Sequence, residues 1–119
     1  MLIPRIAFLI LPVSLLWMTP VAKGHAILLA AKPGFDQVVH GPKLEVALRF
    51  NSRIDAQRSR ITLVDPDVKT HPLPIRSQSS PDSLASEAEV LKAGDYVLRW
   101  QVLAADGHIT RGEVRFHVR

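Results

Sequence analysis

The side chains of this sequence that are most suited to joint chemistry belong to His25, Asp106 and His108. Asp106 and His108 flank Gly107, so a carboxylate and an imidazole can turn toward one point across a flexible glycine. Both groups are ligands for divalent metal ions. Taken alone, Asp-Gly-His is explained by turn formation, because Asp-Gly is a common hairpin dipeptide. Its interpretation as half of a metal site depends on what lies beside it.

The N-terminal stretch predicts that His25 becomes the first residue of a mature chain. A basic residue is followed by an apolar run over residues 6–17, which is typical of a secretory signal peptide. Ala22 and Gly24 supply small residues at the −3 and −1 positions of a cut before His25. An uncleaved anchor and a cut after Ala26 are the alternatives.

We therefore predict a signal peptide over residues 1–24 and a single mature domain over residues 25–119 that is exported from the cytoplasm. Both methionines, Met1 and Met18, lie in the signal peptide, and the chain has no cysteine. The mature domain must fold on its hydrophobic core without disulfides. Removing two basic residues leaves an excess of two positive charges and no basic run with aromatics, so nucleic-acid binding is not expected.

An N-terminal histidine would add nitrogen ligands to the Asp-Gly-His half-site. The free α-amine and the imidazole Nδ1 of one residue form a compact chelate, and the amine, with a pKa near 8, loses its proton readily to a metal. With His108 and Asp106 the set becomes three nitrogens and one oxygen, which favours Cu(II). No thiolate or thioether is present in the mature chain to favour Cu(I).

The elements that must position these residues are short strands. Alternating apolar residues in 44–50, 95–103 and 113–119 indicate half-buried antiparallel strands. Further strands are predicted over 26–32, 60–65 and 71–75, with the proline-containing 71–75 at a sheet edge. Residues 84–91 are interpreted as a strand, with one helical turn as the alternative. Leu91 to Tyr96 resembles a tyrosine corner. Seven short strands of this kind predict an all-β, immunoglobulin-like Greek-key β-sandwich or barrel.

Strand direction then relates the two halves of the site. If each of seven strands reverses the chain, the start of the first strand and the second, fourth and sixth connections share one end. The sixth connection, 104–112, carries Asp106 and His108, and the second is 51–58. His25 is therefore expected at the same end as Asp106 and His108.

The quoted motifs together resemble the CopC family of periplasmic copper-resistance proteins. They are His25-Ala-x-Leu, Lys32-Pro-Gly, 44–50, Leu91-x-Ala-Gly-Asp-Tyr-x-Leu-Arg-Trp100 and Asp106-Gly-His-x-x-x-Gly-Glu-Val-Arg-Phe116. The resemblance covers nearly the whole mature chain. It implies a Greek-key β-fold that binds Cu(II) through the N-terminal amine and imidazole of His25, with Asp106 and His108.

Two departures from the family pattern bear on the number of sites. Some members carry a glutamate where this chain has Ser52, with Asp55 nearby. Some carry a methionine-rich Cu(I) site near a histidine like His71, but no methionine accompanies His71. We therefore predict a single Cu(II) per chain. His40, His71 and His117 are expected at the opposite end, either as solvated surface residues or as a second, imidazole-only site.

The leading functional hypothesis is a monomeric copper-binding protein that is not an enzyme and that sequesters or delivers Cu(II). The resemblance implies a separate, CopD-like inner-membrane copper transporter as a partner. One alternative is a small copper-dependent oxidative enzyme, since polysaccharide monooxygenases also hold copper with an N-terminal histidine. Against it, Asp106 would occupy a coordination position and no aromatic substrate platform is evident. The other alternative is a metal-free interaction domain, in which His25 or Asp106 could be replaced without consequence.

Overall fold

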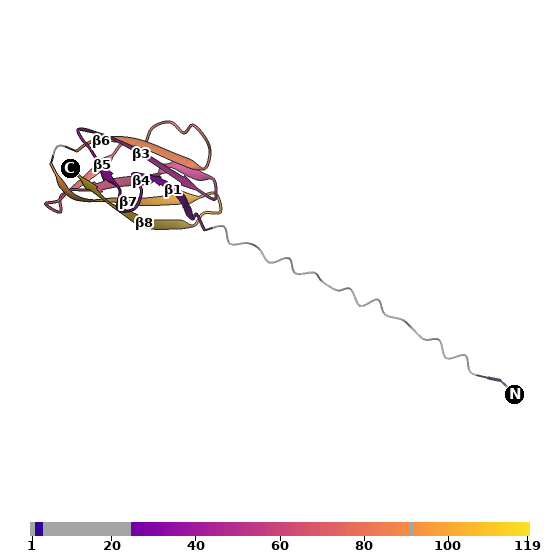
Figure 1. Ribbon diagram of the computed structural model, residues 1–119. Coiled ribbons are helices and arrows are strands. Elements are labelled where there is room, and N and C mark those ends of the chain that lie inside the picture. Colours follow the sequence, from indigo (N-terminus) through magenta and orange to yellow (C-terminus); the bar gives the residue numbers. More distant parts are fainter. Residues whose placement is uncertain (1, 4–24, 91) are drawn as a thin grey trace.

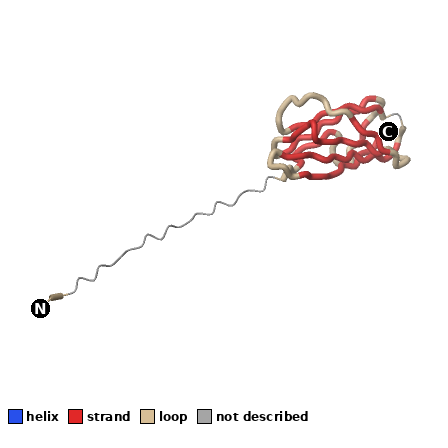
Figure 2. Tube along the Cα trace, turned by 180° about the vertical axis from the view of Figure 1, so that it is seen from behind, coloured by secondary structure: helices blue, strands red, loops and turns tan. Residues whose placement is uncertain are grey.

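The described residues form two β-sheets packed face to face. The computed structural model describes residues 2–3, 25–90 and 92–119, so the signal peptide predicted for 1–24 lies outside the described residues but for Leu2 and Ile3 (Figure 1). Within this part of the chain every regular element is a strand (Figure 2). No helix there is long and apolar enough to cross a membrane. The all-β prediction is confirmed.

The smaller sheet has the order β1-β3-β6 and the larger has the order β2-β8-β7-β4-β5. All neighbours are antiparallel except β2 and β8. The strands are β1 (Leu28–Lys32), β2 (Val38–Val39), β3 (Lys43–Phe50), β4 (Ile54–Val64), β5 (Thr70–Leu73), β6 (Ser83–Glu89), β7 (Gly94–Ala104) and β8 (Ile109–Val118). The proline-bearing β5 lies at the edge of its sheet, as predicted, where a missing N–H removes no ladder hydrogen bond.

The described residues contain eight strands, so the predicted number of seven was wrong. The additional strand is β2, two residues that pair in parallel with His117 and Val118 of β8. Two residues are too few to show an alternating pattern. Because β2 lies within the connection from β1 to β3, it leaves the direction of the other seven strands unchanged.

Two predicted loops are shorter than expected. Residues 51–58 were expected to be a loop, but β4 begins at Ile54. Its pairing with β7 shifts register between Asp55 and Arg60. The connection from β7 to β8 is only 105–108, because β8 continues through Gly112, which pairs with Trp100. Polar residues at a bulge and a glycine inside a strand both resemble loop signals.

The inward faces of both sheets form one core. Fully buried side chains such as Phe50 from β3, Leu98 from β7 and Phe116 from β8 meet there. The Phe50 and Trp100 rings pack edge to face with centroids 5.2 Å apart. Burying each side chain of this size stabilises the fold by about 1.5–3 kcal/mol, which lets the domain fold without disulfides.

The tyrosine corner predicted before β7 is present. The Tyr96 hydroxyl donates a hydrogen bond to the Lys92 carbonyl oxygen at 2.7 Å. Gly94 has a φ of 142°, and a Cβ there would lie 2.8 Å from Cγ of Pro66, so glycine is required. Leu91, the first residue of the predicted corner, lies outside the described residues.

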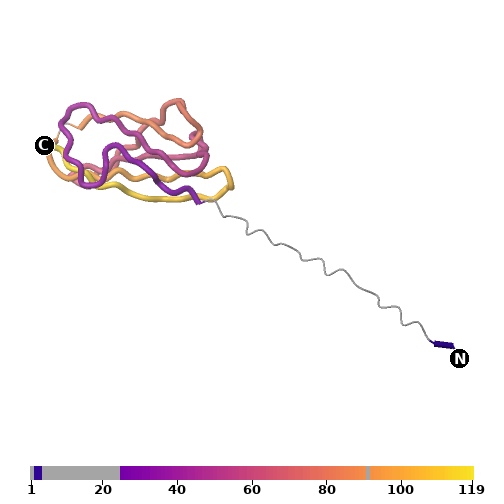
Figure 3. Tube along the Cα trace, turned by 45° about the vertical axis from the view of Figure 1, so that its right-hand side comes forward, coloured from indigo at the N-terminus to yellow at the C-terminus, as the bar shows by residue number. Residues whose placement is uncertain are grey.

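The start of the domain, the connection from β3 to β4 and the turn between β7 and β8 lie at the same end of the sandwich. The Asn51 N–H donates to the Ile27 carbonyl oxygen at 3.0 Å, and the Ala105 N–H donates to the Arg53 carbonyl oxygen at 3.0 Å. Figure 3 shows the indigo start of the domain beside the orange turn between β7 and β8, with the C-terminus at the opposite end. The expected placement of His25 is confirmed.

Candidate metal centre

His25 reaches the site from the chain segment just before β1. Its own side chain is exposed, whereas the next residue, Ala26, is 1% exposed and belongs to the core. The Ile27 N–H then donates to Oδ1 of Asn51 at 2.7 Å. Because the two residues that follow His25 are anchored in this way, the position of His25 is restricted although its side chain is solvated.

Asp106 and His108 are placed by the turn between β7 and β8. The Gly107 N–H donates to the Ala104 carbonyl oxygen at 2.9 Å, and the Ala104 N–H donates to the His108 carbonyl oxygen at 2.9 Å. Gly107 has a φ of 85°, which favours glycine. Oδ1 of Asp106 accepts the backbone N–H of His108 at 3.0 Å, so the aspartate closes the turn with its own side chain.

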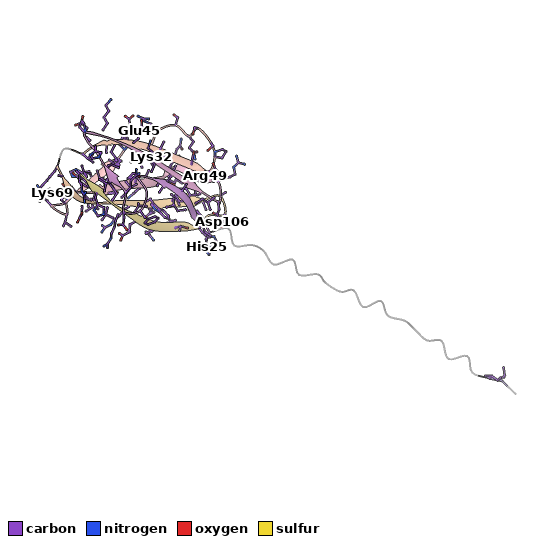
Figure 4. The ribbon with its side chains drawn as sticks, in the orientation of Figure 1. His25, Lys32, Glu45, Arg49, Lys69 and Asp106 are labelled. Carbon is purple, nitrogen blue, oxygen red and sulfur yellow. The ribbon has the colours of Figure 1, made fainter. Side chains whose placement is uncertain are left out.

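The two histidines meet across this end of the sandwich. The His25 and His108 ring centroids lie 5.1 Å apart, with the ring planes at 67°. Oδ2 of Asp106 lies 3.0 Å from Nδ1 of His108, so the carboxylate and the imidazole face each other directly. Figure 4 shows His25 and Asp106 together at the end of the domain.

The carboxylate of Asp106 is held in its charged form. The hydrogen bond from the His108 backbone N–H lowers the pKa of Asp106, and contact with the His108 side chain and the nearby charge of His25 lower it further, while desolvation opposes them. A cation that binds both side chains would take the place of the proton between Oδ2 of Asp106 and Nδ1 of His108.

The spacing of these groups fits one metal ion. With metal–nitrogen bonds of about 2 Å, two imidazoles at adjacent positions on one ion have centroids about 4.5–5.2 Å apart. The separation of the His25 and His108 rings lies in this range. Among residues 25–90 and 92–119, no three His, Asp or Glu side chains form a complete metal-binding group. These residues include His25, Asp106 and His108, so the spacing of the two rings fits one ion although the three side chains do not form a complete group.

Comparison with known proteins decides the family. Residues 28–119 match the CopC domain. The chain belongs to the CopC family. It is 30% identical over 118 residues to protein YobA of Escherichia coli K12, covering 97% of this chain and 94% of YobA. The same identity and coverage are found for protein YobA of Shigella flexneri.

Solved CopC-like structures share the β-sandwich. The crystal structure of CopC from Methylosinus trichosporium OB3b matches with a TM-score of 0.73 and 32% identity, covering 79% of this chain and 93% of that one. PcoC from Escherichia coli, a methionine-rich copper resistance protein, matches with a TM-score of 0.65, covering 80% of this chain and 99% of that one. Its 23% identity supports the fold alone.

Ser52 and Asp55 are engaged in local structure in this CopC-family chain. The Ser52 hydroxyl donates to the Arg53 carbonyl oxygen at 3.2 Å. Oδ1 of Asp55 accepts the backbone N–H groups of Gln57 and Arg58 at 3.1 and 3.3 Å, at the break in the β4 register. These contacts account for both side chains as parts of the loop and the bulge.

The other three histidines have separate partners at the opposite end. His40 Nδ1 lies 3.1 Å from the Arg119 carbonyl oxygen, and His71 Nε2 lies 2.9 Å from Oδ2 of Asp65. His117 lies between two carboxylates, Asp95 and Asp36, at 2.6 and 3.5 Å. Within the described part of the chain these histidines do not converge on one point, which favours the interpretation that they are surface residues.

The residue that sequence reasoning missed is Asn51. It was included in a polar loop and given no role, yet its side chain and its backbone both contact Ile27. The available signal was its place: it directly follows the alternating strand that ends at Phe50, at the end of the sandwich where His25 was expected.

Proposed function

We propose that this chain is a periplasmic Cu(II)-binding protein of copper homeostasis or resistance, which sequesters or delivers one Cu(II) ion per chain. The ligands are the α-amine and imidazole of His25, the imidazole of His108 and the carboxylate of Asp106. The observation that supports it most directly is the approach of the His25 and His108 rings to 5.1 Å beside a charged aspartate.

The donor set accounts for the choice of metal. Amine and imidazole nitrogens with a carboxylate oxygen are borderline to hard ligands, for which Cu(II) has the highest affinity among the divalent first-row ions. A terminal α-amine has an ordinary pKa near 8, so it loses its proton at neutral pH at little cost when a metal binds. Residues 25–119 contain no cysteine or methionine that would favour Cu(I).

The exposure of the site supports exchange of its ion with a partner. The His108 side chain is 50% exposed and that of Asp106 is 29% exposed, so an incoming ligand can reach the metal. A metal that is held for folding is more often enclosed, with all its coordination positions filled by protein side chains. Copper delivery would involve a separate inner-membrane transporter of the CopD kind, with this chain acting as a monomer after removal of residues 1–24.

Binding accounts for the site better than oxidative catalysis. Asp106 would occupy a coordination position that an oxidant needs. The aromatic side chains of Phe50, Tyr96, Trp100 and Phe116 are buried in the core. The exposed Phe35 lies in the connection from β1 to β3, at the opposite end of the sandwich. No aromatic surface among the described residues therefore adjoins the metal centre.

Native mass spectrometry of the secreted protein, with and without one equivalent of Cu(II), tests this proposal. The expected result is a chain that begins at His25 and retains one copper ion. His108→Ala should weaken Cu(II) binding by at least about 10–100-fold, the range for losing a residue that only supports a metal ligand. The matched control is His71→Ala at the opposite end, which should bind one copper as the native protein does. A chain that starts elsewhere, or that stays metal-free, contradicts the proposal.

A further inference from the structure

The chain segment just after His25 is held by Asn51 through two hydrogen bonds. The Ile27 N–H donates to Oδ1 of Asn51 at 2.7 Å, and the Asn51 N–H donates to the Ile27 carbonyl oxygen at 3.0 Å. These bonds pair both backbone groups of Ile27 and the backbone N–H of Asn51. They lie just before the regular β1–β3 ladder, which begins at Leu28 and Phe50. We call this pair of hydrogen bonds the Asn51 clamp.

The clamp leaves His25 little freedom of position. Ala26, between His25 and the clamp, is 1% exposed and packs in the core. Ile27 is 59% exposed, so its own side chain contributes little to anchoring the segment. Chain termini fray unless they are tied down. The segment after His25 is therefore anchored mainly by the backbone hydrogen bonds of Ile27 and by the buried methyl group of Ala26.

The loop that carries Asn51 also holds the other half of the site. The Ala105 N–H donates to the Arg53 carbonyl oxygen at 3.0 Å, and Ile54 pairs with Ala104 at the start of β4. Ala105 is the residue before Asp106. Residues 51–53 thus bind the His25 segment on one side and the turn with Asp106 and His108 on the other.

We propose that Asn51 is a positioning residue that holds the N-terminal histidine beside His108 before copper arrives. This proposal rests on the proposed function. The apparent dissociation constant of a ligand equals the intrinsic constant divided by the fraction of protein in the competent state. A free first residue would chelate copper with its own amine and imidazole, but it would meet His108 and Asp106 only part of the time. The clamp raises that fraction.

The test compares Asn51→Ala with two control variants of the mature protein. Removing the side-chain acceptor should weaken Cu(II) binding by about 3–10-fold, the effect of losing one hydrogen bond. Asn51→Asp retains Oδ1 as an acceptor and should bind at least as tightly as the native chain. Ser52→Ala alters the neighbouring residue, whose hydroxyl donates to the Arg53 carbonyl oxygen, and should leave the affinity unchanged.

A second measurement on the metal-free protein does not depend on copper affinity. Hydrogen exchange at the Ile27 amide should be slow in the native chain and in Asn51→Asp, and about 10-fold faster in Asn51→Ala. If the native Ile27 amide exchanges as fast as an unstructured one, the clamp is absent and the proposal fails, even if Asn51→Ala does not fold.

The two proposals fail in different ways. A native mature chain that binds no Cu(II) refutes the proposed function, whatever the exchange data show. If the native chain binds copper but Asn51→Ala binds it equally well, the copper function stands and the positioning role of Asn51 is refuted. Weaker copper binding together with faster Ile27 exchange, both restored in Asn51→Asp, supports the positioning role.

Discussion

The imidazole of His25, which precedes the first strand, lies edge to face with the imidazole of His108, in the last turn, at a centroid distance of 5.1 Å. Oδ2 of the Asp106 carboxylate lies 3.0 Å from Nδ1 of His108. In the uncleaved chain the backbone nitrogen of His25 is an amide and cannot serve as a metal ligand without losing its proton. The ring pair is therefore preformed, and the amine ligand depends on processing.

Retaining one residue before His25 should weaken Cu(II) binding by at least about 100-fold, because loss of the α-amine as a ligand should exceed the 10–100-fold effect of losing a supporting residue. The terminal amine would then lie one residue away from the position that forms the compact chelate. Competition titration against a chelator of known affinity measures the change. The control adds the same residue after Arg119, which should change nothing. Equal affinity of the two extended chains would show that the α-amine is not a ligand.

The contribution of His117 to the free energy of unfolding of the metal-free protein should decrease as the pH rises. The hydrogen bond to the Asp95 carboxylate raises the pKa of His117, with help from Asp36 and against the effect of desolvation. The unfolded value is near 6.5. The stabilisation is therefore fully present below about pH 6.5 and is lost as the pH rises through the higher folded pKa.

Urea unfolding of the native chain and of Asp95→Asn, each at a pH below 6.5 and at alkaline pH, measures this dependence. Asp95→Asn should show a smaller loss of stability between the two conditions. An NMR titration of the His117 ring should show its pKa moving down toward the ordinary value in the same variant. An unchanged ring pKa in Asp95→Asn would contradict the role assigned to that hydrogen bond.

Tyr96→Phe should lower the free energy of unfolding by about 1 kcal/mol, because it removes the hydrogen bond to the Lys92 carbonyl oxygen and leaves the ring in place. Thermal or urea denaturation gives the value. Copper affinity should not change, because the corner lies at the end of the sandwich opposite His25. A loss of copper binding at unchanged stability would contradict this separation of the two ends.

Gly112→Ala should destabilise the domain by about 1–3 kcal/mol, the usual cost of overpacking. An added Cβ would lie 2.2 Å from Cζ2 and 2.6 Å from Cε2 of Trp100, whose indole is buried and cannot move freely. Gly34→Ala is the matched control, since its nearest neighbour would be 3.7 Å away. Equal unfolding free energies for the two variants would show that the Trp100 indole can move aside without destabilising the domain.

Much of this architecture could be predicted from local pattern. Alternation in β3, β7 and β8 is strong because one face of each strand is buried, and the tyrosine corner has a recognisable spacing. Strand reversal then related the ends of the chain without coordinates. The site residues His25, Asp106 and His108 followed from this reasoning and from the family resemblance, and their role as ligands remains a prediction.

Other features depend on contacts between segments far apart in the chain. β2 exists because Val38 and Val39 lie beside β8, and Gly112 belongs to a strand because the Trp100 indole occupies the space above it. Tertiary structure also decided the partners of His40, His71 and His117, and the contact of Asn51 with Ile27. The sequence by itself determined which side chains could bind a metal and which strands are half-buried, because both follow from residue type and short-range spacing. Only folding decided which of those side chains meet, because that depends on the packing of two sheets.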